Sequence, residues 1–191
     1  MVNKLIFGFG INDSTNPITI KSQYIKPFYI WHSMLRRCYN FQYKLKIPTY
    51  KDCSVCEEWK YYSKFLEWFN VNYIKDYDLD KDILVSGNRI YSPEFCRFIP
   101  HFINSILTDR GNDRGLYPIG VNYEKSRNKY KACISRYGKV NHLGYYSTPE
   151  EAHEAWRLAK IEYVGEVARA YLFSGEISEE IFDSLIARDF K

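Results

Sequence analysis

The chain has 191 residues, and 46% of them are hydrophobic, which excludes a wholly disordered protein. No apolar stretch approaches the roughly 18 residues that cross a bilayer, and the N-terminus lacks a cleavage-site pattern, so we expect a cytoplasmic protein with no membrane partner. The formal net charge of +4 is modest and by itself points to no particular partner.

The distribution of this charge is more informative than its sum. Residues 117–146 hold six basic residues against Glu124 alone, whereas residues 147–191 hold five basic and ten acidic residues. A basic stretch of this kind is typical of a surface that faces a polyanion. A solvated basic hairpin is the alternative.

The first half of the chain predicts two amphipathic helices after a mixed N-terminal extension, residues 1–26. From Pro27 to about Tyr39, apolar residues recur at spacings of three and four, which predicts the first helix. Residues 40–52 are basic and predict a loop. The same periodicity returns between residues 55 and 73 and predicts the second helix.

Residues 77–107 predict a two-stranded ribbon that is followed by a helix. Residues 77–83 suit a first strand, the Ser-Gly-Asn sequence at 86–88 suits a turn, and residues 89–91 suit a return strand. The apolar spacing of residues 98–107 predicts the helix.

The second half predicts three strands and one long helix after a polar linker at residues 109–115. The strands are expected at 119–123, 129–137 and 140–146, and the middle one alternates well. This alternation places Tyr130, Ala132 and Ile134 on one face and Lys129, Lys131 and Cys133 on the other. Thr148 as N-cap, Pro149 after it and two acidic residues in the first turn predict a helix that runs to about Tyr171.

This second half resembles the AP2 DNA-binding domain over about 55 residues. The resemblance implies a three-stranded antiparallel sheet, packed on one helix, that enters the major groove of double-stranded DNA. The matching residues, in chain order, are Gly120-Val121, Lys129-Tyr130-Lys131-Ala132, Ile134, Gly138-Lys139, Leu143-Gly144-Tyr145-Tyr146, Thr148, Glu150-Glu151-Ala152 and Ala155.

The alternating strand and its turns supply the candidate contacts to DNA. Lysines and arginines on the outward face or near turns suit phosphate, and polar side chains there suit base edges. The arginines usual on the first strand of the family are absent, so the preferred base sequence does not carry over. For any single lysine, a solubilising charge is the alternative. The candidate DNA-binding residues are Asn122, Lys125, Arg127, Lys129, Lys131, Arg136, Lys139 and His142.

Residues 27–107 resemble HNH endonucleases of the phage type, including homing endonucleases that join such a unit to an AP2 unit. The resemblance implies a ββα-metal unit with preceding helices and one divalent ion, Mg²⁺ or Mn²⁺. The matching residues are Trp31-His32-Ser33-Met34, Arg37-Cys38-Tyr39, Val55-Cys56-Glu57-Glu58-Trp59, Phe65, Leu79-Asp80-Lys81-Asp82-Ile83, Gly87-Asn88, Tyr91-Ser92-Pro93, Cys96-Arg97-Phe98 and Asn104.

By this resemblance, Asp80 and Asn104 are the expected metal ligands, and Asn88 pins the ribbon. The histidine expected after the first-strand aspartate is replaced by Lys81, and lysine is a poor base at neutral pH unless it is desolvated. His101, one helical turn before Asn104, is the candidate ligand or alternative base.

Two alternatives to this metal site stay open. Asp82 is a further possible ligand. Lys81 can instead be a cation that binds phosphate, with residues 80–82 as a surface charge cluster.

The cysteines allow two interpretations. Five is an odd number, and a reducing compartment makes a disulfide framework unfavourable. Cys38, Cys56 and Cys96 match recurring positions of the resembled group and, with Cys53, are candidate ligands of a structural Zn²⁺. Buried free thiols are the alternative.

The sequence thus predicts an α+β protein. Its expected parts are an extension at 1–26, an HNH-like nuclease domain at 27–110, an AP2-like domain at 111–172 and a C-terminal tail at 173–191. The expected function is metal-dependent hydrolysis of DNA. A catalytically inactive DNA-binding regulator or architectural protein of the same fold is the alternative.

Overall fold

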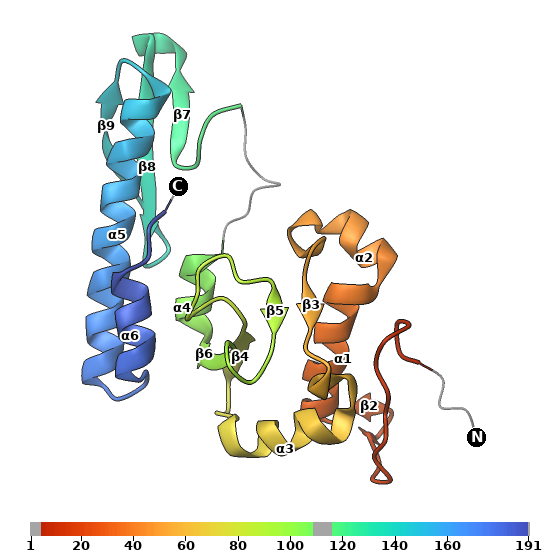
Figure 1. The fold of residues 1–191 in the computed structure, drawn as a ribbon. Coiled ribbons are helices and arrows are strands. Elements are labelled where there is room, and N and C mark those ends of the chain that lie inside the picture. The colour runs from red at the N-terminus through yellow and green to blue at the C-terminus, as the bar shows by residue number, and fades with distance from the viewer. Residues whose placement is uncertain (1–4, 109–115, 191) are drawn as a thin grey trace. The chain divides into compact units, whose positions relative to one another are not determined.

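The computed structural model describes residues 5–108 and 116–190, and they form two compact units (Figure 1). The first unit extends to His101, and the second begins at Phe102. Each unit combines helices with small sheets, which confirms the α+β class. The predicted linker at 109–115 lies outside the described residues. No helix within the described ranges has the length and apolar character needed to cross a membrane.

The first unit opens with a short antiparallel hairpin of β1 (Thr19–Ile20) and β2 (Gln23–Tyr24). Helix α1 (Lys26–Tyr39) follows and confirms the first predicted helix, because its predicted apolar face is buried. The predicted loop at 40–52 is wrong, since it contains α2 (Phe41–Lys46) and the 3-10 turn η1 (Pro48–Tyr50). The side chain of Asn40 caps α2 by accepting a hydrogen bond from the Tyr43 amide at 2.8 Å.

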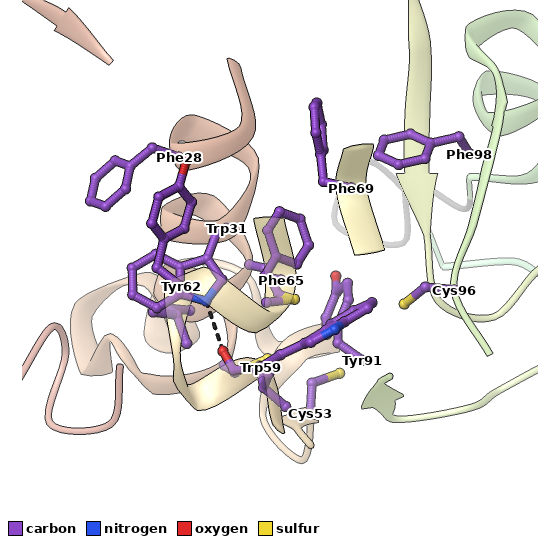
Figure 2. Packing of buried hydrophobic residues seen from close by; sticks show 14 residues of the cluster. Phe28, Trp31, Cys53, Trp59, Tyr62, Phe65, Phe69, Tyr91, Cys96 and Phe98 are labelled. Carbon is purple, nitrogen blue, oxygen red and sulfur yellow. Dashed lines mark hydrogen bonds between the residues drawn. The ribbon is translucent and has the colours of Figure 1, made fainter. Parts of the chain in front are cut away.

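The second predicted helix is shorter than expected. Strand β3 (Ser54–Val55) and the 3-10 turn η2 (Glu58–Lys60) occupy its first part, and α3 (Tyr62–Asn72) forms the rest. The periodicity did not reveal β3, because its parallel partner lies 36 residues farther along the chain. Figure 2 shows the aromatic core between α1 and α3, where the indole of Trp31 donates to the Trp59 carbonyl at 2.7 Å.

The ribbon of the first unit pairs differently from the prediction. Strand β4 (Tyr77–Asp80) lies antiparallel to β6 (Arg97–Pro100), whereas β5 (Ile90–Tyr91) pairs in parallel with β3. The predicted partner, residues 89–91, is therefore wrong. Helix α4 (His101–Leu107) begins three residues later than predicted, because Phe98 belongs to β6. The Phe98 ring packs in the aromatic core of the first unit.

The second unit contains the predicted three-stranded sheet. Its antiparallel strands are β7 (Val121–Glu124), β8 (Lys129–Arg136) and β9 (Lys139–Tyr146), in that order, with the 3-10 turn η4 (Lys125–Arg127) between the first two. Helix α5 (Pro149–Phe173) lies along the sheet (Figure 1), and it begins at the predicted N-cap Thr148, which forms a capping box with Glu151. The segment expected as a tail contains α6 (Glu179–Ile186).

The sheet packs closely on α5 around small residues. Val121, Ala132 and Ala152 form the buried centre of this contact. Gly120 has a φ of +80°, and a Cβ at this position would come within 2.1 Å of the Trp156 ring. Glycine is therefore required both by the backbone conformation and by the close approach of α5.

Candidate functional site

The β7–β9 sheet has one face toward α5 and one face away from it. On β8, Ala132 and Ile134 are buried on the helix side, as the sequence predicts. Lys129 and Lys131 are separated from these residues by odd numbers of positions and therefore lie on the outward face. Lys129 is exposed and Lys131 is half-buried.

Residues of the neighbouring strands continue this outward face. Cross-strand partners share a face of the sheet, and Lys131 lies opposite Asn122 of β7 and Tyr145 of β9. The guanidinium of Arg127 lies over the Tyr145 ring at 4.6 Å, and the His142 ring meets the same tyrosine edge-on at 4.5 Å. We call this set the sheet surface: Asn122, Arg127, Lys129, Lys131, His142 and Tyr145.

A β-bulge decides the place of His142. The register shifts between Ala132 and Cys133, so that His142 lies opposite Cys133 on the outward face. Its Nδ1 lies 3.3 Å from the Ala132 carbonyl oxygen. Sequence alternation alone does not locate such a bulge. Two further predicted contact residues, Lys125 in η4 and Lys139 at the start of β9, are exposed at opposite ends of the sheet.

Arg136 is the exception among the predicted DNA contacts. It lies an even number of positions from Ala132, so it points toward α5, where it donates to the Ala159 carbonyl at 3.0 Å and to Glu162 at 2.6 Å. Its guanidinium also lies 5.7 Å from the Tyr163 ring. Arg136 lies beside the turn between β8 and β9, as expected, but its guanidinium is bound to α5. The alternation of β8 already contained the signal for this inward direction.

In the first unit, two carboxylates meet at the end of β4. Asp80 is half-buried, and its Oδ1 accepts a hydrogen bond from the Asp82 amide at 2.8 Å. Burial, together with the negative charge of Asp82, raises the pKa of Asp80 to about 7, against the opposing effect of Lys81. Two neighbouring carboxylates that disfavour each other's ionisation attract a cation.

Lys81 is buried and binds within its own loop. Its Nζ donates to the Asn88 carbonyl at 2.8 Å, lies 3.2 Å from an Asp82 carboxylate oxygen and lies 6.0 Å from the Tyr91 ring centroid. Asn88 returns the contact, because its Nδ2 donates to the Lys81 carbonyl at 2.6 Å and to the Ile90 carbonyl at 2.8 Å. These bonds close the loop from β4 to β5, which is the pinning role expected of Asn88.

His101 lies beside a carboxylate that sequence reasoning missed. Its Nδ1 is 2.7 Å from Oδ2 of Asp78, and the imidazole is largely exposed. The period of two in β4 places Asp78 on the same face as Asp80, and this signal could have identified it. Asn104 lies on α4 within the second unit. In the described ranges, no three His, Cys, Asp or Glu side chains gather closely enough to hold a metal ion.

The cysteines of the first unit pack in its core. Cys38, Cys53 and Cys96 are buried, and all three are free thiols. Figure 2 shows Cys53 and Cys96 within this core. Burial, assisted by the neighbouring Cys53, raises the pKa of Cys38 to about 12. Burial also raises the pKa of Cys96 far above its usual value. As neutral thiols they behave as small apolar side chains.

Comparison with models of protein families found no family that matches the chain, and comparisons with curated proteins and with solved structures found no match either.

Proposed function

We propose that the chain binds double-stranded DNA through the sheet surface of the second unit. The observation that carries this proposal is the division of β8, whose small apolar residues face α5 while Lys129 and Lys131 face outward. A three-stranded sheet can enter the major groove and present alternate side chains to it. In this proposal the cations contact phosphates, and Asn122 and His142 contact base edges.

The geometry also supports the AP2-like fold as the form of this unit. The order of three antiparallel strands and one helix agrees with it, as do Gly120 under Trp156 and the capped start of α5. Arg136 does not belong to the proposed DNA-binding surface, because its guanidinium is bonded to Glu162 and to the Ala159 carbonyl of α5.

A salt titration of the full chain tests the proposal. The logarithm of the binding constant for duplex DNA should fall linearly with the logarithm of salt concentration, with a slope of about −0.9 for each phosphate contact. The double variant Lys129→Gln/Lys131→Gln should make the slope shallower by about two. Arg157→Gln is the control. Arg157 already forms ion pairs with Glu154 and Asp189, so its removal should leave the slope unchanged. Binding that ignores salt would contradict the proposal.

A second candidate function is hydrolysis of DNA by an HNH-type site in the first unit. The chain order of β4, β6 and α4 is the ββα order of that family, and the carboxylate pair of Asp80 and Asp82 lies at the end of β4. The carboxylate oxygens of this pair suit Mg²⁺ or Mn²⁺. Such an ion would stabilise charge on the scissile phosphate.

His101 is the best candidate for the general base. An Nδ1 proton shared with Asp78 leaves the lone pair on Nε2, which is the arrangement that orients a catalytic imidazole. Lys81 is a poor candidate, because its ammonium is already bonded to the Asn88 carbonyl and to Asp82. The same observation favours the alternative function, a catalytically inactive DNA-binding regulator.

A plasmid assay with and without Mg²⁺ separates these two functions. If the site is active, Asp80→Ala should abolish metal-dependent cleavage and leave DNA affinity nearly unchanged, because the sheet surface provides the grip on phosphates. His101→Gln should lower the rate, and His153→Gln, on α5, is its control. Cleavage by Asp80→Ala at the wild-type rate would refute the nuclease site, and the absence of cleavage by the wild type would favour the regulator.

A further inference from the structure

The first unit contains a second concentration of positive charge that neither candidate site uses. Residues 14–51 include no aspartate and no glutamate. The acid-free segment is followed by residues 52–101, in which acidic residues outnumber basic ones. The seven basic residues of the acid-free segment are Lys21, Lys26, Arg36, Arg37, Lys44, Lys46 and Lys51.

The fold gathers five of these cations around the end of α1, α2 and η1. The guanidinium of Arg36 lies 5.0 Å from the Tyr43 ring, and that ring lies 6.1 Å from the Tyr50 ring. Lys44 donates to the Lys51 carbonyl at 2.9 Å, which joins α2 to the segment after η1. Arg89, outside the acid-free segment, adds a sixth cation by donating to the Thr49 carbonyl of η1 at 3.0 Å.

An exposed aromatic residue accompanies these cations. Phe41 is 70% exposed and Leu45, one helical turn later, is 62% exposed. Arg36, Lys46 and Lys51 are also exposed, and Asp52 is the acidic residue that borders them. We define the α2 surface as Arg36, Phe41, Lys44, Lys46 and Lys51.

We propose that the α2 surface is a second site of contact with nucleic acid, with its cations on phosphates and Phe41 against a sugar or base. Cations interleaved with aromatic rings are the pattern that grips a polyanionic backbone with stackable bases. A helix of six residues offers too little apolar length to lie in a membrane interface. The proposal rests on the proposed function, because the ligand is the same DNA that the sheet surface binds.

The α2 surface also connects to the carboxylate pair of the first unit. Arg37 lies over the Tyr50 ring at 5.8 Å and donates to the Tyr91 hydroxyl at 3.3 Å. The ammonium of Lys81, beside Asp80, lies over the same Tyr91 ring. A DNA backbone that binds to the α2 surface is therefore bound by the same unit that carries the candidate nuclease site. Two contacts in one chain make the second binding event intramolecular, which raises the affinity of the whole chain.

The test compares charge-matched variants of the full chain in the same salt titration. Lys46→Gln/Lys51→Gln should make the salt slope for duplex DNA shallower by about two. Lys64→Gln/Lys75→Gln removes the same charge from α3 and from the segment after it, and it should leave the slope unchanged. Equal slopes in the two double variants would overturn the proposal.

The variants of the sheet surface separate this proposal from the proposed function. If Lys129→Gln/Lys131→Gln makes the salt slope shallower and Lys46→Gln/Lys51→Gln does not, DNA binding by the α2 surface is refuted and DNA binding by the sheet surface is supported. The reverse result supports the α2 surface and refutes the sheet surface. A wild-type chain that binds no DNA at low salt refutes both.

The aromatic part of the α2 surface has its own readout. Phe41→Ala should weaken DNA binding several-fold without changing the salt slope, because an apolar contact releases no counterions. Phe173→Ala, at a still more exposed phenylalanine at the end of α5, is the control and should bind as the wild type does. Anionic phospholipid vesicles give the competing outcome. Loss of vesicle binding in Lys46→Gln/Lys51→Gln with unchanged DNA binding would assign the surface to membranes and overturn the proposal.

Discussion

The lysines of the two candidate sites have opposite surroundings. Lys81 in the first unit is buried and bonded to the Asn88 carbonyl and to Asp82. Lys129 and Lys131 in the second unit lie on the outward face of a sheet, and Lys129 is exposed. A buried ammonium needs internal partners, because it has lost its hydration. An exposed ammonium keeps its water and can exchange it for a phosphate.

A lysine that matches a motif can contact a ligand only where its surroundings leave the ammonium exposed. Lys81 holds the loop from β4 to β5, so it acts on stability first. Lys129 and Lys131 contribute little to the fold, so they are available for binding. Four variants test this division by their free energy of unfolding, and two of them, Lys81→Met and Lys129→Ala/Lys131→Ala, also by their affinity for duplex DNA.

The largest effect is expected for Asn88→Ala. The change removes two hydrogen bonds donated by Nδ2 and the one that Oδ1 accepts from the Ile90 amide at 3.1 Å. We expect the free energy of unfolding of the first unit to fall by about 3 kcal/mol. Urea unfolding followed by tryptophan fluorescence measures it, and Asn122→Ala on the sheet surface is the control. A loss below that of the control would mean that the loop is not held by Asn88.

Lys81→Met should come next. Methionine fills the buried space but leaves the Asn88 carbonyl without its charged donor. The expected loss of unfolding free energy is about 2 kcal/mol. DNA affinity should be unchanged, because the ammonium points into its own loop. A loss of affinity with full stability would return Lys81 to the role of a phosphate contact.

Lys160→Met tests a partly buried lysine of the second unit, and it should raise the free energy of unfolding where Lys81→Met lowers it. Burial lowers the pKa of Lys160 to about 8 from a usual value near 10.5, so between these values the unfolded state binds more protons than the folded state. The free energy of unfolding of the wild type should therefore rise with pH across this window.

At pH 7 the charged ammonium of Lys160 is a cost to the fold. Lys160→Met removes this cost together with the hydrogen bond that the ammonium donates to the Ile106 carbonyl. We expect the removed cost to be the larger effect there, so that the variant is more stable than the wild type by a margin on the order of 1 kcal/mol. The margin should shrink as the pH approaches 10.5. Denaturant unfolding at pH 7 and pH 10 measures it, and a margin that is the same at both values would contradict the burial of this charge.

The smallest change in stability is expected for Lys129→Ala/Lys131→Ala. Surface substitutions of this kind stay within about 0.5 kcal/mol. Helical circular dichroism should be retained while DNA affinity falls. A loss of helical signal would mean that these lysines support the contact between the sheet and α5.

Local periodicity predicted the elements that bury one face. The apolar spacing of α1 predicted its buried side, and the alternation of β8 predicted which residues face α5. The capping residue Thr148 predicted the start of α5. These features depend on neighbours within one or two turns, which a single segment specifies.

The predictions that were wrong depended on distant partners. Strand β4 pairs with β6 rather than with β5, and the paired residues lie 17 to 23 positions apart in the chain. Strand β5 pairs instead with β3, which lies 36 positions earlier. The short helix α2 is an exception, because its cap at Asn40 binds the Tyr43 amide and is a local signal that the sequence contains. The pair of Asp78 and His101 joins two elements 23 residues apart, so the local alternation of β4 places Asp78 beside Asp80 but does not reveal its contact with His101.

The sequence by itself determined the α+β class, the amphipathic helix α1, the three strands and capped helix of the second unit, and the alternation of its lysines. Only the tertiary structure decided which charged side chains remain exposed. Lys81 is buried and bonded to the Asn88 carbonyl, and Arg136 is bonded to Glu162 of α5. His142 lies on the outward face of the sheet because of a β-bulge. The physical reason is that burial changes the solvation of a charge, and burial is set by segments that meet only when the chain has folded.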